Sequence, residues 1–289
     1  MIETRRVDDV AHQRNADGET SRREAQLYQV LGRYESILVA YSGGVDSAYL
    51  AWAANQARPG QVLAVTADSP SYPRRHRAMA ESIAREFHLP HEFIQTSELD
   101  RPEYRANAAN RCYHCKTELY EHLARMAAER GFGVVVDGSN ADDRGDYRPG
   151  RQAAREFGVQ SPLDEAGLTK QEIRDLARLA GLPVWDEPAS ACLSSRIPYQ
   201  SEVTEAKLAV IEQAEEVVRS LGFRVFRVRH HDTMARLEIG RDEMARALDP
   251  AVAEALVARL KAIGYKYVTL DLQGYRTGSL NEVLHLRPV

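Results

Sequence analysis

The sequence predicts an α/β protein with a doubly wound parallel sheet, followed by a small C-terminal α+β domain. Two observations support this prediction. Over the first part of the chain, short apolar runs alternate with stretches of helical periodicity, and this alternation is typical of parallel sheets with right-handed crossovers. Beyond about residue 200 the order changes to a helix, two strands, a helical segment and a strand, which suits a small α+β domain.

The N-terminal part supplies four expected strands. Residues 36–42 form an apolar run that ends in two glycines, and helical periodicity continues to about residue 57. Further strands are expected at residues 61–69, 91–97 and 133–140. Helices are expected at residues 25–35, around 75–87 and over 117–131. Residues 1–24 are rich in charge and poor in apolar side chains, so we expect a flexible N-terminal tail there.

A loop dense in proline, serine and cysteine marks the expected domain boundary near residue 200. Before it, Thr169 and Glu172 have the spacing of a capping box, which predicts a helix start. We expect residues 25–200 to form a nucleotide-binding domain and residues 201–289 a substrate-binding and oligomerisation domain. In the second domain, we expect a helix that ends at Gly222 and then strands at 223–232 and 234–240. A helical segment at 241–263 and a last strand at 265–274 follow.

Composition narrows the functional class. The chain has 289 residues, of which 44% are hydrophobic and 28% charged, as in ordinary soluble proteins. The formal net charge of −4 argues against a dominant nucleic-acid-binding surface, so nucleic acid is not expected as a partner. No apolar run approaches the roughly 20 residues that cross a bilayer, and no apolar stretch follows the charged N-terminus as in a signal peptide. We expect a cytoplasmic protein with no membrane partner.

A glycine-rich segment lies where the first expected strand meets its helix. It contains Ser42, Gly43, Gly44, Asp46 and Ser47. The glycines let the backbone approach phosphate oxygens, and the helix N-terminus offers unpaired N–H donors and a favourable dipole. The serines add hydroxyl donors, and Asp46 can hold an Mg²⁺ ion that bridges phosphates. A glycine turn with a serine or aspartate cap is the alternative.

This segment resembles the PP-loop of the N-type ATP pyrophosphatases; the Gly-Lys ending of a Walker A loop is missing. The resemblance implies an adenine nucleotide alpha hydrolase-like fold and cleavage of ATP between its α- and β-phosphates. It also implies that Asp68, after the second strand, lies near the adenosine. Ser139 with Asp142 or Asp143, after the fourth strand, would complete the phosphate and Mg²⁺ site. Taken alone, such an Asp-rich turn is more often capped by its own side chains.

The three cysteines form a second group of candidate residues. Cys112 and Cys115 have C-x-x-C spacing, and Cys192 follows in the proline- and serine-rich loop. Thiolates at this spacing commonly bind zinc or an iron–sulfur cluster. A redox dithiol and a pair of buried thiols are the alternatives. If the metal is zinc, His114 or His230 could supply a fourth ligand.

Three stretches of the chain resemble the LarE sulfur transferases of nickel-pincer cofactor synthesis. They are NRCYHCK at residues 110–116, PASACLSSRIPY at 188–199, and RVRHH with the following ARLE at 227–238. Together with the PP-loop, the resemblance covers the chain from about residue 25. It implies an enzyme that uses ATP to adenylate each carboxylate of a pyridinium-3,5-dicarboxylate mononucleotide and converts it to a thiocarboxylate.

The resemblance also implies how sulfur is delivered. Some LarE members sacrifice the sulfur of one cysteine at the position of Cys192, whereas others hold a 4Fe-4S cluster through three cysteines and bind an extra sulfide. Cys112, Cys115 and Cys192 match the cluster type, so we favour the cluster over a sacrificial cysteine and both over zinc. The expected cofactors are then ATP, Mg²⁺ and a 4Fe-4S cluster. The expected partners are a small-molecule nucleotide substrate, sulfide or another sulfur donor, and further copies of the chain in a homo-oligomer.

Arginines near and beyond the boundary suit an anionic substrate. Arg227 and Arg229 are two residues apart on an expected strand and so share one face, and paired guanidinium groups suit phosphate or carboxylate. The LarE resemblance implies that these two, with Arg276, hold the substrate's phosphate. It assigns further catalytic or pocket roles to Ser195, Arg196 and Glu238. A solvated strand face with surface ion pairs is the alternative.

Other functional classes share part of this pattern. A PP-loop tRNA thiolation enzyme would use the same adenylation and cluster chemistry, but it needs a broad basic face, and none is obvious here. An amide-forming ligase needs an ammonia source, and no glutaminase-like segment is recognisable in the sequence. A nucleotide sensor without catalysis is disfavoured by the set of Asp46, Asp142 and Asp143.

Overall fold

The structure, a computed structural model, describes residues 3–145, 149–188 and 191–284. The chain forms two compact units. The first comprises Met1–Ala67, Arg75–Ile94 and Leu119–Glu187, and the second comprises Asp68–Arg74, Gln95–Glu118 and Pro188–Val289. The division therefore falls after Glu187 and not near residue 200, and two earlier segments also belong to the second unit.

Four parallel strands form the sheet of the first unit, in the order β3-β2-β1-β4. They are β1 (Ile37–Ala40), β2 (Val62–Asp68), β3 (His91–Gln95) and β4 (Val134–Val136). The central strand β1 pairs with β2 from Ile37↔Val62 and with β4 from Ile37↔Val134. The chain thus moves from β1 first to one side and later to the other, which makes β1 the topological switch point. The predicted fold class is confirmed.

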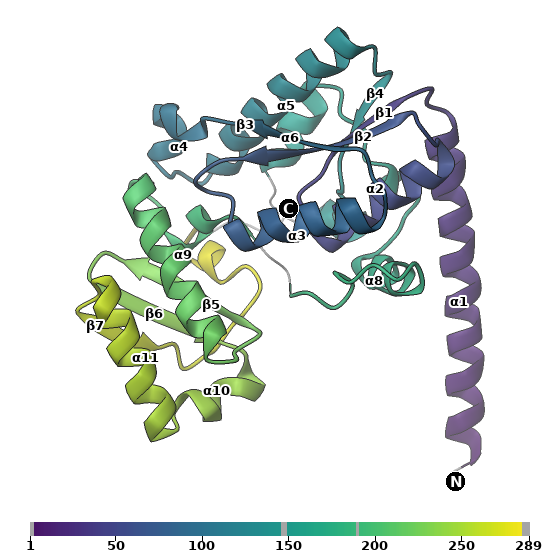
Figure 1. The fold of residues 1–289 in the computed structure, drawn as a ribbon. Coiled ribbons are helices and arrows are strands. Elements are labelled where there is room, and N and C mark those ends of the chain that lie inside the picture. The colour runs from purple at the N-terminus through teal and green to yellow at the C-terminus, as the bar shows by residue number, and fades with distance from the viewer. Residues whose placement is uncertain (1–2, 146–148, 189–190, 285–289) are drawn as a thin grey trace. The chain divides into compact units, whose positions relative to one another are not determined.

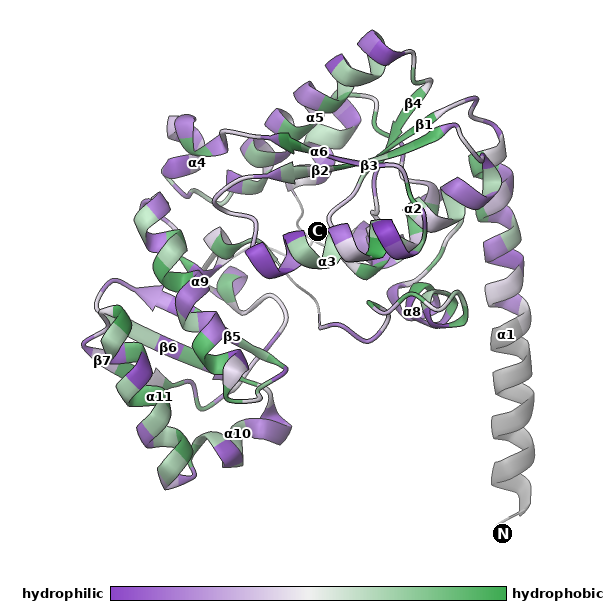
Figure 2. Ribbon diagram, viewed as in Figure 1, coloured by the Kyte–Doolittle hydropathy of each residue, from purple (hydrophilic) through white to green (hydrophobic). Residues whose placement is uncertain are grey.

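Helices lie on both faces of this sheet. Figure 1 shows α5 (Arg111–Arg130) and α6 (Pro149–Glu156) on one face, with α2 (Val45–Ala57) and α3 (Arg74–Glu86) on the other. The short α7 (Pro162–Glu165) and α8 (Lys170–Leu179) follow. In Figure 2 the apolar colour concentrates on β1, β4 and α2. This is the pattern of a sheet buried on both faces.

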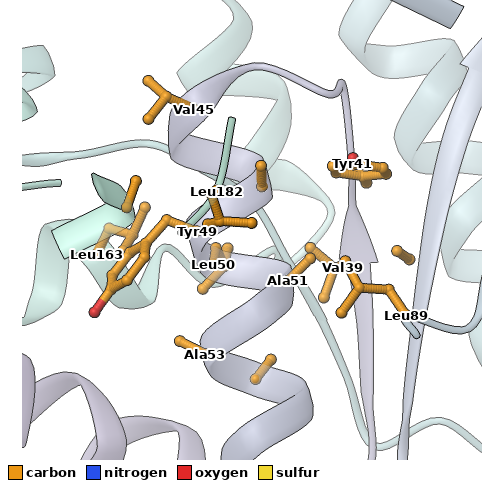
Figure 3. Packing of buried hydrophobic residues seen from close by; sticks show 14 of the residues in the cluster. Val39, Tyr41, Val45, Tyr49, Leu50, Ala51, Ala53, Leu89, Leu163 and Leu182 are labelled. Carbon is orange, nitrogen blue, oxygen red and sulfur yellow. The ribbon is translucent and has the colours of Figure 1, made fainter. Parts of the chain in front are cut away.

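The core of the first unit lies between β1 and α2. All four residues of β1 are buried, as are Leu50 and Ala51 of α2. Figure 3 shows Leu50 and Ala51 beside Val39, with Leu163 and Leu182 from later segments packed on the same helix. Fully burying a Leu or Val side chain is worth roughly 1.5–3 kcal/mol. The core therefore fixes the end of β1 and the start of α2, where the phosphate loop lies.

The N-terminal segment differs from the expected flexible tail. Helix α1 runs without a break over Glu3–Gly32. Within it, Arg23 Nη1 donates to Glu172 Oε2 of α8 at 2.9 Å, and Tyr49 of α2 donates to Glu24 Oε1 at 2.8 Å. The apolar periodicity of the sequence predicted a helix only at residues 25–35. The contacts of the preceding turn, which contains Arg23 and Glu24, are polar and give no apolar period.

Two other helices differ from their expected limits. Helix α5 begins at Arg111, six residues before the expected start, so Cys112 and Cys115 lie on its first turn and not in a connecting loop. The expected helical segment at 241–263 is two helices, α10 (Arg241–Ala247) and α11 (Pro250–Ile263). Pro250 begins α11 as its first residue, behind an Asp249 cap, because proline lacks the N–H that a continuous helix requires.

The second unit contains a three-stranded sheet in the order β5-β6-β7. β5 (Phe226–His231) is antiparallel to β6 (Met234–Ile239), and β7 (Tyr267–Leu270) is parallel to β6. Helix α9 (Glu205–Ser220) packs with α11 and β5, and apolar residues on one face of β5 and β6 enter this core. The opposite face carries charged residues, because neighbours along a strand point to opposite sides. None of the described helices is long and apolar enough to span a membrane.

Candidate functional site

The phosphate loop of the first unit has a conformation that requires glycine. Gly43 has φ = +69°, and a Cβ at this position would lie 2.9 Å from the Cβ of Ala80. Ser47 Oγ lies 3.1 Å from both the backbone N and the Oγ of Ser42, and it donates to Gly44 O at 3.0 Å. Gly44 is the N-cap of α2 and provides no side-chain cap. The start of this helix can therefore receive an anion through its backbone N–H groups.

Asp46 is the carboxylate of this loop. Its Oδ2 forms an ion pair with the ammonium group of Lys170. Its Oδ1 is buried and has no hydrogen-bond partner among the described residues. Because an unpaired buried carboxylate oxygen is costly, this oxygen fits a hard cation such as Mg²⁺. Asp46 therefore suits the metal-holding role that the sequence predicts.

The loop after β4 approaches the same helix start. A Cβ on Gly138 would lie 3.0 Å from Ser47 N, so the backbone passes directly against α2. Asp137 accepts hydrogen bonds from Tyr120, Ser139 and Ser161. The predicted residue Ser139 thus lies at the carboxyl ends of β1 and β4, beside the phosphate loop.

Asp142 and Asp143 have structural partners in this loop. Asp142 Oδ2 accepts from the backbone N of Lys170 at 2.8 Å, and Asp143 Oδ2 accepts from the backbone N of Asn140 at 3.0 Å. Both carboxylates therefore cap backbone N–H groups. Asp142 and Asp46 contact the same residue, Lys170, through its backbone and its side chain respectively, so the structure brings these two predicted residues together.

Asp68, predicted to lie near the adenosine, ends β2 and belongs to the second unit. Its Oδ2 accepts from Gln95 Nε2 at 3.2 Å. The residues that follow Asp68 and Gln95 donate to the buried carboxylate of Glu98. Ser69 Oγ donates to Glu98 Oε1 at 2.6 Å, and Thr96 Oγ1 donates to Glu98 Oε2 at 3.0 Å. These hydroxyl groups satisfy the carboxyl oxygens of Glu98, which is buried in the second unit.

All three cysteines belong to the second unit and are free thiols. Cys112 and Cys115 are one turn apart on α5 and so share a face of that helix. Burial raises the pKa of the Cys115 thiol, and the charges of Glu98, Cys192 and Cys112 raise it further. Cys115 also packs against the apolar cluster that contains Tyr104 and Leu193, beside the Cys192 segment. Within the described ranges, no three His, Cys, Asp or Glu side chains converge closely enough to hold a metal ion.

A buried hydrogen-bond network surrounds the thiols. Cys192 Sγ lies 3.0 Å from Ser194 Oγ, which accepts from Tyr104 Oη at 2.9 Å. Arg111 Nη1 donates to Ser194 O at 2.9 Å, and its Nη2 lies 4.0 Å from Cys112 Sγ. Burial alone would lower the pKa of the Arg111 guanidinium, but the neighbouring Cys192 and Cys112 raise it above its usual value.

The loop after Cys192 is held by a buried ion pair. Arg196 Nε donates to Glu215 Oε1 at 2.8 Å, and Arg196 Nη1 donates to the carbonyl of Cys192 at 3.1 Å. Ser195 Oγ also donates to Cys192 O at 2.8 Å. Burial opposes the charge of Glu215, yet Arg196 holds the pKa of this carboxyl below its usual range. The predicted residues Ser195 and Arg196 thus fix the backbone that carries Cys192.

The charged face of the second-unit sheet gathers three predicted residues. Arg229 Nη2 donates to Glu238 Oε2 at 2.7 Å and to Ser279 Oγ at 2.7 Å, and its Nη1 donates to Ser195 O at 2.7 Å. Arg227 lies on the same face of β5, with its guanidinium 4.9 Å from the ring centre of Tyr275. Burial and the nearby Arg196 lower the pKa of Arg227 to about 10. This face can receive an anion.

Arg276 lies at the edge of this group. Its Nε donates to Glu282 Oε1 at 3.1 Å, and its Nη1 is 3.9 Å from Asp271 Oδ1. Asp271 also pairs with Arg236, 3.7 Å away, which in turn contacts Glu238 at 3.1 Å. Arg276 is therefore connected to Glu238 indirectly, through the ion pairs of Asp271 and Arg236.

Comparison with known proteins identifies the family. No family model matches the chain. It is 43% identical over 258 residues to the uncharacterized protein slr1717 of Synechocystis sp., covering 89% of this chain and 96% of that protein. It is 36% identical over 264 residues to the pyridinium-3,5-bisthiocarboxylic acid mononucleotide synthase of Lactiplantibacillus plantarum, covering 91% of this chain and 95% of that protein. The chain belongs to the LarE family.

A weaker similarity covers most of the chain as well. The uncharacterized protein MJ0830 of Methanocaldococcus jannaschii is 28% identical over 243 residues, covering 84% of this chain and 92% of that protein. The LarE assignment therefore applies to both units of the structure. It confirms the family that the four sequence motifs predict.

Sequence reasoning missed several residues of this LarE chain that touch the candidate sites. Lys170 was overlooked because it lies far from the phosphate loop in sequence, although a lysine in the first turn of a helix opposes the helix dipole and so signals another role. Glu215 appears in sequence as one carboxylate of an amphipathic helix, and nothing marks it as the buried partner of Arg196. Arg111 and Tyr104 gave no signal beyond their place near the cysteines.

Proposed function

We propose that this protein is an ATP-dependent sulfur transferase of nickel-pincer cofactor synthesis. It would adenylate the carboxylates of a pyridinium-3,5-dicarboxylate mononucleotide and convert them to thiocarboxylates. The observation that carries the proposal is the 36% identity, over 91% of the chain, with a synthase named for the corresponding bisthiocarboxylic acid mononucleotide. The enzymatic class rests on that relative, and the site residues support the individual steps.

The phosphate loop would perform the first step. The N–H groups at the start of α2 would bind phosphate oxygens of ATP, and Asp46 Oδ1 would bind Mg²⁺, since this oxygen is buried and unpaired among the described residues. A substrate carboxylate oxygen then attacks the α-phosphorus. The bond to the bridging oxygen breaks, pyrophosphate leaves, and an acyl-adenylate forms. Ser139, Asp142 and Asp143 would shape the phosphate end of this site.

The three thiols would hold a 4Fe-4S cluster through Cys112, Cys115 and Cys192. The proposal rests on the sequence motifs and on the common location of the three thiols in the second unit, because no three metal-ligating side chains converge among the described residues. When bound, the cluster supplies a sulfide as nucleophile. The conversion as a whole would replace the acyl C–O bond to AMP with a C–S bond, with AMP as the leaving group.

The charged face of the second-unit sheet would hold the mononucleotide. Arg227 and Arg229 offer guanidinium groups to its phosphate, with Arg276 at the edge. Glu238, which is fully buried, orients Arg229 and Arg236. Ser195 and Arg196 position Cys192 through its carbonyl. The protein's contribution is thus placement and exclusion of water.

The test of this function is release of pyrophosphate from ATP in the presence of the pyridinium dicarboxylate mononucleotide. Asp46→Asn should reduce the rate at least about 100-fold, because it removes the charge that would hold Mg²⁺ beside the phosphates during adenylyl transfer. Asp175→Asn is the matched control, since this carboxylate is an exposed member of α8 paired with Arg178. Equal rates for the two variants would remove Asp46 from the mechanism, and release that depends on tRNA would replace the proposed substrate.

The sulfur source is tested separately. Anaerobic iron and sulfide analysis of the purified protein should find a cluster that Cys112→Ser abolishes. A mass decrease of one hydrogen sulfide after turnover, localised to Cys192, would instead identify a sacrificial cysteine. Both measurements use the whole chain, which we expect to act in the cytoplasm as a homo-oligomer.

A further inference from the structure

We propose that Asn107 and Arg111 form a clamp that holds the Cys192 loop against the helix carrying Cys112 and Cys115. Arg111 in addition places a guanidinium group 4.0 Å from Cys112 Sγ. The inference deepens the proposed function, because it rests on these thiols acting as one ligand set. It assigns a positioning role to two residues for which sequence patterns give no signal.

Asn107 provides the anchor of the clamp. It is fully buried and has φ = +53°, in the left-handed region that asparagine tolerates better than most residues. Its side-chain amide nitrogen lies 2.8 Å from Pro198 O, 2.9 Å from Ser201 O and 3.3 Å from Ile197 O. Its own carbonyl accepts from the backbone N of Gln200 at 3.0 Å. One residue thus holds the turn that follows the Cys192 segment.

Arg111 extends the clamp to the thiols. Its side chain is only 3% exposed, and Nη1 donates both to Asn107 Oδ1 at 2.5 Å and to Ser194 O at 2.9 Å. Ser194 is two residues from Cys192, and Arg111 is the first residue of the helix that carries the other two cysteines. The planar guanidinium fork is what allows one side chain to bind two acceptors and still approach Cys112 Sγ.

Charge explains why the clamp ends in an arginine. Three thiolates held close together would repel one another, and a cation beside them would offset part of their charge. Arg111 Nη2 lies 4.0 Å from Cys112 Sγ, and Arg111 Nη1 donates to the carbonyl of Ser194, two residues from Cys192 in another segment of the second unit. Tyr104, which also reaches this network through Ser194, is neutral and cannot offset a negative charge. Arg111 therefore combines the geometric and the electrostatic role.

Arsenite binding to the metal-free protein tests the clamp. Arsenite reacts with three thiols without any redox change: three S–H and three As–OH bonds break, three As–S bonds form, and three water molecules leave. The readouts are the arsenite affinity and the number of cysteines protected from alkylation, counted by intact mass. Circular dichroism establishes that each variant is folded. The wild-type protein should protect all three cysteines.

Four variants distinguish the roles. Arg111→Met should weaken arsenite binding at least about tenfold and leave Cys192 unprotected, because charge and fork are both lost. Arg111→Lys keeps the charge and should weaken binding less. Asn107→Gly keeps the left-handed backbone but loses the amide, so it should also release Cys192. Arg105→Met, which removes a half-exposed cation paired with Glu202 in the same unit, should behave as wild type.

Several results would overturn the clamp. Full protection of three cysteines with wild-type affinity in Arg111→Met and Asn107→Gly would do so, and so would equal weakening in Arg105→Met. Fewer than three protected cysteines in the wild type would refute the gathered set itself. If Arg111→Met does not fold, Arg111→Lys and Asn107→Gly decide. A wild type that binds no iron or sulfide but shows these differences would refute the cluster and leave the clamp standing.

Discussion

At the scale of single residues, Gly43 carries two separable constraints. It needs a left-handed backbone, and it has no room for a Cβ beside Ala80. Gly60 shares the first constraint, with φ = +74°, but a Cβ there would meet nothing within 4 Å. Substituting Gly60 therefore tests backbone strain alone, whereas substituting Gly43 tests backbone strain together with steric overlap.

We predict that Gly60→Ala lowers the free energy of unfolding by about 1 kcal/mol and Gly43→Ala by about 2–4 kcal/mol, since the second adds a clash to the strained φ. Urea denaturation of both variants measures the difference. Equal costs would mean that α3, which carries Ala80, shifts to accommodate the added methyl group, and the phosphate loop would then be less rigid than the structure indicates.

Lys170 is a residue-scale test of the phosphate site. Its ion pair with Asp46 is partly exposed, with side-chain exposures of 33% and 23%, so Lys170→Met should change stability by less than about 1 kcal/mol. We nevertheless expect pyrophosphate release to fall about 100-fold, because an ammonium group near the transferring phosphoryl group is lost. Lys170→Arg should recover part of the rate. A variant with normal turnover would reduce Lys170 to a structural partner of Asp46.

Individual residues also show where sequence reasoning reaches its limit. The phosphate loop could be predicted because strand, glycines, serines and aspartate are consecutive. Arg227, Arg229 and Glu238 could be selected because strand periodicity places alternate residues on one face. Lys170, Glu215 and Arg111 could not, because each meets its partner across many intervening residues and by a side-chain contact that leaves no periodic signal.

At the scale of elements, α8 joins local capping to a long-range contact. Thr169 and Glu172 form the predicted capping box, with both reciprocal hydrogen bonds present. Glu172 also accepts from Arg23 and Thr20 of α1. Burial opposes its charge, yet Thr169 and Arg23 hold the pKa of Glu172 below its usual value of 4.5.

We predict that Thr169→Ala costs about 1 kcal/mol of unfolding free energy and Glu172→Ala about 2 kcal/mol, because only the second also releases α1. Since the folded-state pKa of Glu172 is lowered, its ionic contribution is present above the unfolded pKa and is lost as pH falls through the folded value. The difference between wild type and Glu172→Ala should therefore shrink on acidification below about pH 4.5. A difference that grows towards low pH would contradict the assignment.

Element limits were predictable where caps are local. The start of α8 at its capping box and the end of α2 near residue 57 follow from neighbouring residues. The break at Pro250 between α10 and α11 was not predicted, although the proline itself marks it. Helix α5 was expected too late because its first turn contains cysteines, histidine and tyrosine, which have modest helix propensity; tertiary contacts of Arg111 stabilise that turn. Helix α6 has no counterpart among the expected elements, since its eight residues give only about two turns of periodicity.

At the scale of the whole molecule, the second unit combines segments from three parts of the chain. Leu208 and Ile211 of α9 pack in one apolar cluster with Tyr104, Leu193 and Ile197. The alternation of strands and helices predicts the sheet of the first unit. It does not indicate which connecting segments of that sheet belong to the second unit. For this reason the order of elements was predictable and the division between the units was not.

We predict that a fragment of residues 201–289 does not fold on its own. It lacks the partners of Leu208 and Ile211 and also Arg196, so Glu215 would remain buried and uncompensated, a loss of about 3–5 kcal/mol. Residues 188–289 restore Arg196, Leu193 and Ile197 and should show more tertiary structure by near-ultraviolet circular dichroism. Cooperative melting of the shorter fragment at the temperature of the full chain would refute the interleaved second unit.

The interleaving has a consequence for biosynthesis. The hydrogen bond from Leu193 N to Ser71 O joins a segment made early to one made late. While the ribosome is still translating the residues before Cys192, Cys112 and Cys115 have already been synthesised and Cys192 has not. The nascent chain therefore passes through a stage with an incomplete thiol set. For the proposed cluster, iron or sulfide that arrives at that stage would find only two of its three ligands, so the proposal implies loading after synthesis is complete.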